Sequence, residues 1–207
     1  MDGNGYDITG LFIDRNGPAS LFAYSNNADI SNLNVEGDIT GRNYVGLICG
    51  KQTGGSVKEC NVSGKVTGFT YVGGLVGHCS GSVDNCKSDV LVRGVENGCT
   101  AMGGITGLIN TGSVTGCYFN GTIRNTGGQY IGGATVGDIG GVCGRLVKGT
   151  IKGSGANTTL RDDASVVYRH GGFVGLNNDG IISDCWSIAT LNIPAYDSTG
   201  THGVFAG

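Results

Sequence analysis

Short apolar segments flanked by small residues recur along the whole chain, separated by polar and glycine-rich stretches. The clearest copy is Gly74-Leu75-Val76-Gly77, which follows Tyr71-Val72-Gly73. Other copies include Ser20-Leu21-Phe22-Ala23 and Gly46-Leu47-Ile48-Cys49. The first apolar residue of each copy serves as an anchor, and the anchors are Leu21, Leu47, Leu75, Ile105, Val142, Phe173 and Val204. They are 26, 28, 30, 37, 31 and 31 residues apart, a period that predicts stacked repeats burying a shared core.

Three further columns of residues keep the same register. The residues 11 to 13 positions after each anchor are Leu33, Cys60, Cys86, Cys117, Ser154 and Cys185. Three positions before that column lie Ile30, Val57, Val83, Val114, Ile151 and Ile182. Six positions after it lie Ile39, Val66, Val92, Ile123, Leu160 and Leu191. Most of these types favour strands, and equivalent residues of stacked rungs lie about 4.8 Å apart. We therefore expect the anchors up to Phe173 and the cysteine column, with Ser154, to form the core.

The pattern predicts an all-β fold, a single-domain parallel β-solenoid of about six to seven coils of roughly 26 to 37 residues. The handedness rule for parallel crossovers favours a right-handed coil. We expect two strand-like segments per coil, joined by turns such as 53–56 and 177–180. Residues 1–16 are expected to form an atypical N-terminal coil, and residues 17–207 the repeats. Both ends of the sequence suggest a piece of a longer protein, whose cut ends predict end-to-end self-association.

Variation in coil length is confined to the segment between the last apolar column and the next anchor. This segment has 7, 8, 12, 18, 12 and 12 residues in successive coils. The longer segments contain Tyr130, Tyr168, Tyr196, Arg161 and Arg169. Tyrosines offer flat contact area and arginines offer forked hydrogen bonds, so we predict a ligand site for a host protein or carbohydrate at this corner. The alternative is a passive stalk with decorative loops.

Composition narrows the class of partner. The chain has 42 glycines without a collagen period, 14% charged residues and a net charge of -3. We therefore do not expect a nucleic-acid partner. No apolar run approaches the roughly 20 residues that span a bilayer, so membrane insertion is not expected either. The first residues lack the basic and apolar stretches of a secretory signal, which we expect outside this fragment.

The eight cysteines suggest a disulfide framework at first sight. Four of them share one repeat position with Leu33 and Ser154, which indicates a small buried group. We expect reduced, packed thiols. Cys99 lies in a length insertion and is expected to be the most exposed.

Three stretches resemble the GLUG-motif family of repeats. They are 2–11, 30–35 and Tyr71-Val72-Gly73-Gly74-Leu75-Val76-Gly77, with Gly74-Leu75-Val76-Gly77 as the motif itself. The family is known from large bacterial surface or secreted proteins, often adhesin-like, and from accessory regions of immunoglobulin-A-cleaving metallopeptidases. The resemblance implies an extracellular or cell-surface stalk or binding module. It transfers no catalytic residue.

The residues themselves offer little chemistry. His78, His170 and His202 fit no zinc-peptidase spacing, and we expect no metal, no cofactor and no catalytic residue. Asp162, Asp163 and His170 provide a weak alternative, a cation site. A polysaccharide-acting β-helix enzyme stays open as an alternative, because such enzymes place carboxylates and arginines on one outer face. A third alternative is an accessory region of a secreted peptidase.

Overall fold

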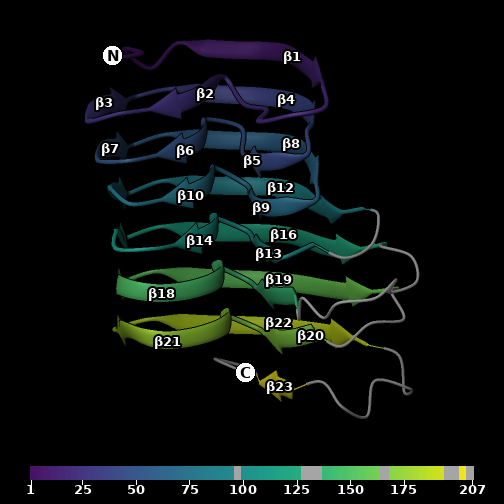
Figure 1. Cartoon of the computed structure of the whole chain (residues 1–207). Coiled ribbons are helices and arrows are strands. Elements are labelled where there is room, and N and C mark those ends of the chain that lie inside the picture. Colours follow the sequence, from purple (N-terminus) through teal and green to yellow (C-terminus); the bar gives the residue numbers. More distant parts are fainter. Residues whose placement is uncertain (96–98, 127–136, 164–167, 194–200, 204–207) are drawn as a thin grey trace.

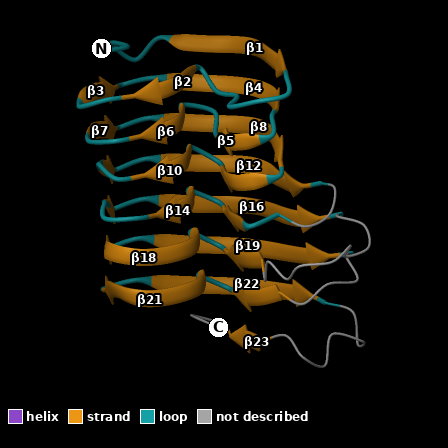
Figure 2. Cartoon of the chain, viewed as in Figure 1, coloured by secondary structure: helices purple, strands orange, loops and turns teal. Residues whose placement is uncertain are grey.

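The computed structural model describes residues 1–95, 99–126, 137–163, 168–193 and 201–203. Its described elements are 23 strands, and the strands that pair in the described part run parallel to one another (Figures 1 and 2). The chain winds from the N-terminus at the top of Figure 1 to the last strand at the bottom, and each turn passes through three sheets. The predicted parallel β-solenoid is confirmed. The described part contains no helix that could cross a membrane.

Three sheets form the sides of the solenoid. The seven-stranded sheet contains β1 (Asp7–Asp14), β4 (Asn34–Thr40), β8 (Asn61–Gly68), β12 (Lys87–Gly94), β16 (Tyr118–Asn125), β19 (Gly155–Asp162) and β22 (Trp186–Asn192). The six-stranded sheet contains β5 (Asn43–Val45), β9 (Thr70–Gly73), β13 (Ala101–Gly103), β17 (Gly137–Gly140), β20 (Tyr168–Gly171) and β23 (Thr201–Gly203). The ten-stranded sheet contains β2 (Phe22–Ser25), β3 (Ala28–Ser31), β6 (Cys49–Gln52), β7 (Gly55–Lys58), β10 (Val76–Cys79), β11 (Ser82–Asp84), β14 (Thr106–Ile109), β15 (Ser113–Thr115), β18 (Cys143–Lys152) and β21 (Val174–Ser183).

Each coil thus has three sides rather than two strand segments. The ten-stranded sheet begins as two strips separated by a turn, and these strips merge in the long strands β18 and β21. The predicted turn at 177–180 is therefore wrong. Asp179 and Gly180 pair with Lys148 and Gly149 inside one long strand, and the Asn177 side chain bonds the N–H and C=O of Gly180 at 2.9 and 3.1 Å.

The predicted apolar columns are ladders of the structure. Val57 pairs with Ile30 and Val83, and the ladder continues to Ile182. Ile39 pairs with Val66, and that ladder continues to Leu191. Their side chains alternate into the interior, where they form one continuous core.

A column of small residues lies where the ten-stranded sheet packs against the six-stranded sheet. Its members are Ala23, Gly50, Gly77, Gly107, Gly144 and Gly175. A Cβ at Gly77 would lie 2.6 Å from the backbone N of Val45. The alignment of Gly46-Leu47-Ile48-Cys49 with Gly74-Leu75-Val76-Gly77 is wrong at its last position, because Cys49 pairs with Val76 and not with Gly77. That rung contains one extra apolar residue, which moves its small residue to Gly50.

The cysteine column occupies the corner before the seven-stranded sheet, and its thiols bond the backbone of neighbouring rungs. The Cys60 N–H donates to Cys86 Sγ at 3.4 Å, and the Cys86 N–H donates to Cys117 Sγ at 3.4 Å. Ser154 fills the same slot, where its Oγ accepts the Cys117 N–H at 3.1 Å. Each thiol or hydroxyl of the column also donates to the carbonyl two residues earlier, as Cys86 does to Asp84 O at 3.3 Å. From Cys86 to Ser154 the position therefore supplies an acceptor as well as a small volume, whereas Leu33 on the first of these rungs supplies no acceptor.

All eight cysteines are free thiols, and seven of them are buried. The expectation that Cys99 is the most exposed is wrong, since its side chain is 1% exposed. The chain has returned to the core at this point, just before β13, and the Cys99 thiol bonds Ala101 O at 3.7 Å. Cys185, on the last full rung, is the partly exposed one.

Both ends of the core are less covered than its middle. Leu21 and Phe22 at the first rungs and Leu191 and Ile193 at the last are only partly buried. The anchors between them, such as Leu75 and Ile105, are fully buried. Residues 1–16 provide β1, which pairs with β4 and extends the seven-stranded sheet by one strand. Self-association through the ends stays a prediction.

Candidate functional site

The outer face of the seven-stranded sheet presents four outward columns of side chains. Alternation along each strand places residues of one column on successive rungs. On the last four rungs, in the order β12, β16, β19 and β22, the first column holds Lys87, Tyr118, Gly155 and Trp186, and the second holds Asp89, Asn120, Asn157 and Ile188. The third holds Leu91, Thr122, Thr159 and Thr190, and the fourth holds Arg93, Arg124, Arg161 and Asn192. This surface is called the outer face below.

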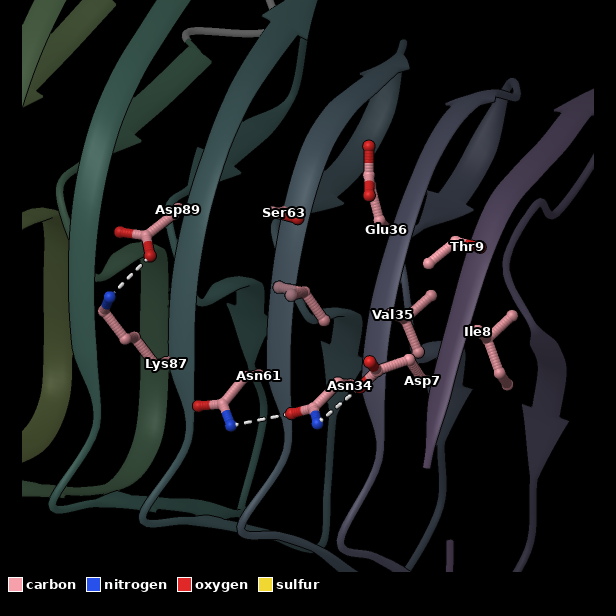
Figure 3. Close-up of a pocket in the computed structure, with 11 residues that line it drawn as sticks. Asp7, Ile8, Thr9, Asn34, Val35, Glu36, Asn61, Ser63, Lys87 and Asp89 are labelled. Carbon is pink, nitrogen blue, oxygen red and sulfur yellow. Dashed lines mark hydrogen bonds and ion pairs between the residues drawn. The ribbon is translucent and has the colours of Figure 1, made fainter. Parts of the chain in front are cut away.

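Polar side chains predominate on the N-terminal half of the outer face, as Figure 3 shows. The Asn34 amide donates to Asp7 Oδ1 at 2.9 Å, and the Asn61 amide donates to Asn34 Oδ1 at 2.9 Å. Lys87 and Asp89 form an ion pair at 2.6 Å beside this amide ladder. Together these rungs border a depression of about 510 Å³. Its polar groups are largely engaged with one another.

A second amide ladder lies in the neighbouring column, in the C-terminal half of the outer face. The Asn120 amide donates to Asp89 Oδ1 at 3.3 Å, and the Asn157 amide donates to Asn120 Oδ1 at 3.0 Å. A second depression of about 530 Å³ lies beside it, and its lining includes Thr122 and the arginines Arg124 and Arg161. The polar side-chain groups of its lining are thus one amide, one hydroxyl and two guanidinium groups, together with the carboxylate of Asp89.

An exposed aromatic pair lies at the opposite edge of this half. The rings of Tyr118 and Trp186 have centroids 5.6 Å apart and planes inclined by 33°, although their strands are separated by β19. The intervening residue is Gly155, and a Cβ there would lie 2.3 Å from Trp186 Cε2. Glycine therefore makes room for the indole ring to lie over its backbone. Trp186 is 46% exposed, so the pair offers solvent a flat apolar platform.

The arginine edge consists of Arg93, Arg124 and Arg161, which are direct neighbours in the ladder. Arg93 Nε donates to Thr126 Oγ1 at 3.3 Å, and Arg124 Nε bonds Asp163 Oδ2 at 2.7 Å. Arg161 is exposed and has no ion pair among the described residues. The row continues a column that holds Thr40 and Thr67 on the preceding rungs.

The residues predicted from the sequence to bind a ligand are only partly placed together. Tyr130 and Tyr196 lie outside the described residues, and only the backbone of Tyr168 is described, in β20. Arg161 belongs to the outer face, whereas Arg169 lies in the six-stranded sheet. A ligand site shared by these five residues stays a prediction.

Arg169 has an internal partner. It bonds Asp138 Oδ1 at 2.5 Å, and Arg145 bonds the other oxygen of the same carboxylate. The Asp138 side chain is fully buried, and buried charges require such pairing. Arg169 therefore contributes to stability through this ion-pair cluster.

The acidic residues weighed as cation ligands point to opposite sides of the chain. Asp162 is buried and bonds His170 Nε2 at 2.8 Å and the Asn125 amide at 3.0 Å, while Asp163 pairs with Arg124 on the outer face. Among the described residues, no group of three His, Cys, Asp or Glu side chains is arranged to hold a metal ion.

A second aromatic cluster, also missed by sequence reasoning, joins the six-stranded and ten-stranded sheets. The ring of Tyr44 lies 5.6 Å from that of Tyr71 and 5.9 Å from that of His78, and Tyr24 lies beside it. Lys51 Nζ covers one face of Tyr44 at 5.3 Å. Burial, followed by the charge of Lys51, lowers the pKa of His78. The position of Tyr44 and Tyr71 just before two successive motif copies could have indicated this cluster.

Comparisons with known proteins agree with the fold. The GLUG motif matches residues 41–67, which cover one rung from the end of β4 to β8. A crystal structure of a candidate immunoglobulin A1 protease from Bacteroides ovatus matches with a TM-score of 0.75 and 24% sequence identity, covering 99% of this chain and 67% of that one. Comparison with curated proteins gives no significant match. The resemblance to GLUG-motif repeat proteins is thereby confirmed.

Proposed function

We propose that this GLUG-repeat solenoid is a non-enzymatic adhesive module of a bacterial surface or secreted protein, and that it holds a carbohydrate on the outer face. The observation that carries the proposal is the exposed Tyr118–Trp186 platform beside the Asn120–Asn157 amide ladder. Sugar rings combine apolar C–H faces with hydroxyl edges. The C–H faces stack on flat aromatic rings, and the hydroxyl groups form hydrogen bonds with amides, which both donate and accept.

Rigidity supports the same reading. The platform and the ladder lie on strands of a continuous sheet, and their backbone is fixed by parallel pairing over the whole length of β16, β19 and β22. A preformed surface loses little conformational entropy when a ligand binds. Trp186 contributes a large contact area with few rotatable bonds, the type of residue that dominates binding energies.

The carboxylates of the outer face support binding rather than catalysis. A general acid or base must be free to exchange a proton with the substrate. Both oxygens of the Asp89 carboxylate are instead engaged by the protein, since Lys87 Nζ lies 2.6 Å from Oδ2 and the Asn120 amide donates to Oδ1 at 3.3 Å.

A glycan-binding screen of the 207-residue chain tests the proposal. Truncating a tryptophan that stacks on the ligand costs about 2 kcal/mol or more, so Trp186→Ala should weaken binding by at least about tenfold. Tyr118→Ala should weaken it in the same direction. Tyr24→Ala is the control, because Tyr24 is an exposed aromatic residue, 62% exposed against 46% for Trp186, but lies on the ten-stranded sheet. Circular dichroism confirms that each variant keeps its fold.

Other outcomes identify the competing functions. Loss of binding only in the triple variant Tyr130→Ala/Tyr168→Ala/Tyr196→Ala would move the site to the loop corner. Absence of any ligand would favour a stalk. Turnover of a bound polysaccharide would replace the proposal with a β-helix enzyme, and stimulation of an attached peptidase domain would favour an accessory role.

A further inference from the structure

The arginine row is confined to three consecutive rungs of one column. Arg93, Arg124 and Arg161 are in register, whereas the same column holds Thr67 on the rung before them and Asn192 on the rung after. Neutral residues therefore fit this position equally well. The chain as a whole carries a net charge of -3, so the row is not a consequence of a generally basic composition.

Stacking three guanidinium groups is unfavourable without an anion. Adjacent rungs lie about 4.8 Å apart, and like charges directly opposite each other in a sheet are destabilising. Asp163 compensates one of the three charges through its 2.7 Å contact with Arg124. Arg93 contacts the neutral Thr126, and Arg161 has no acidic partner among the described residues. Among the described residues, the row therefore carries more positive than negative charge beside the second depression.

Resting on the proposed function, we infer that the carbohydrate is anionic and that its carboxylate or sulfate groups bind the arginine row. A guanidinium group donates two parallel hydrogen bonds to such an oxyanion, which an amide or hydroxyl cannot do. Arg124 and Arg161 both line the second depression, together with Asn120, Thr122 and the carboxylate of Asp89, which Lys87 neutralises. An anion beside the arginine row contacts the guanidinium group of Arg161 and the part of the Arg124 guanidinium group that Asp163 does not engage, while the attached sugar reaches Asn120.

The geometry also sets a minimum ligand size. Trp186 and Asn192 mark the two edges of the outer face, and six residues at about 3.3 Å each place these edges about 20 Å apart along the strand. A ligand that contacts both the aromatic platform and the arginine row is therefore an oligosaccharide, and it lies along the strands. A single charged sugar would reach one edge only.

Matched polymer pairs test the inference. Polygalacturonate and its methyl-esterified form differ in carboxylate charge, and dextran sulfate and dextran differ in sulfate charge. Free galacturonic acid, a single charged sugar, tests whether binding requires an oligosaccharide. The charged member of a pair should bind at least about tenfold more tightly, the effect of one charge-assisted hydrogen bond. A preference for the carboxylated or for the sulfated polymer identifies which anion is read. Raising the salt from about 0.1 M to about 1 M shortens the Debye length from about 10 Å to about 3 Å and should weaken this binding.

The variant Arg124→Gln/Arg161→Gln should lose at least about tenfold in affinity for the charged polymer and little for its neutral partner. Lys148→Gln/Lys152→Gln is the charge-matched control, because both lysines are exposed on β18 of the ten-stranded sheet. Equal losses in the two variants would overturn the inference, since binding would then follow net charge. Equal affinity for charged and neutral polymers, lost in Trp186→Ala, would overturn it and leave the proposed function standing. Binding of none of these or of other glycans would overturn both.

Discussion

Replacing Cys86 tests whether the corner column needs a hydrogen-bond acceptor or merely a small apolar group. Cys86 Sγ accepts the buried Cys60 N–H at 3.4 Å and donates to Asp84 O at 3.3 Å. Cys86→Val keeps the apolar volume but removes the acceptor. Cys86→Ser keeps both hydrogen bonds, as Ser154 does naturally at the same position.

The expected magnitudes separate the two explanations. An unsatisfied buried N–H costs about 1–3 kcal/mol, so Cys86→Val should lower the free energy of unfolding by about this amount. Cys86→Ser loses only the difference between sulfur and oxygen packing, which we expect to be under about 1 kcal/mol. An apolar requirement would give the opposite order, with Val the milder change.

Hydrogen exchange followed by NMR provides a local readout, which matters because stacked rungs need not unfold in one step. In Cys86→Val the Cys60 amide should exchange roughly 5- to 150-fold faster, the factor that corresponds to about 1–3 kcal/mol. The Asn61 amide is the internal control, since it donates to Leu33 O at 2.9 Å in every variant. Unchanged exchange at Cys60, or a Val variant as stable as the Ser variant, would refute the acceptor argument.

Three further predictions concern the core. Gly77→Ala should destabilise the solenoid by more than about 2 kcal/mol, because a Cβ there meets backbone atoms of two neighbouring strands; a thermal midpoint equal to that of the wild type would contradict this. Burial raises the pKa of the Cys143 thiol from 9.0 to about 12, so its contribution to stability is complete below pH about 9 and is lost as the pH rises toward about 12. In denaturation at several pH values, the free energy of unfolding of Cys143→Val should therefore fall less steeply between pH about 9 and about 12 than that of the wild type. Valine is the residue at the paired position, Val174. The same pH dependence in both proteins would contradict the prediction. Asp138→Asn leaves two arginines beside a buried neutral group and should cost about 3–5 kcal/mol in denaturant unfolding, whereas Asp163→Asn on the surface should cost under about 1 kcal/mol; similar losses would be inconsistent with the burial.

The inward columns could be predicted because parallel stacking repeats the same environment at every rung. Val57 and Val83 face the same interior, so their sequence offsets from the anchors reveal the ladder directly. The one-residue shift at Cys49 escaped the pattern, because Leu47, Ile48 and Cys49 are all buried and alternation does not distinguish them. The environment of Cys99 was misjudged because a length insertion does not show where the chain re-enters the core.

The outer face could be predicted only in part. The repeat register alone predicts that Thr67, Arg93, Arg124 and Arg161 share one column, and therefore that three positive charges are stacked there. The platform does not, because Tyr118 and Trp186 lie two rungs apart and meet only across a glycine. Outward positions are free to differ from rung to rung, so no repeat indicates which of them act together.

The corner ladder has a direction. Each thiol or hydroxyl accepts a hydrogen bond from the backbone N–H of the preceding rung. Cys86 accepts from the N–H of Cys60, and Ser154 accepts from the N–H of Cys117. During synthesis from the N-terminus, the corner N–H of the newest rung has no acceptor until the following rung has been made. Each rung would then complete its hydrogen bonds only when the next rung folds onto it, so folding would follow synthesis with a delay of one turn.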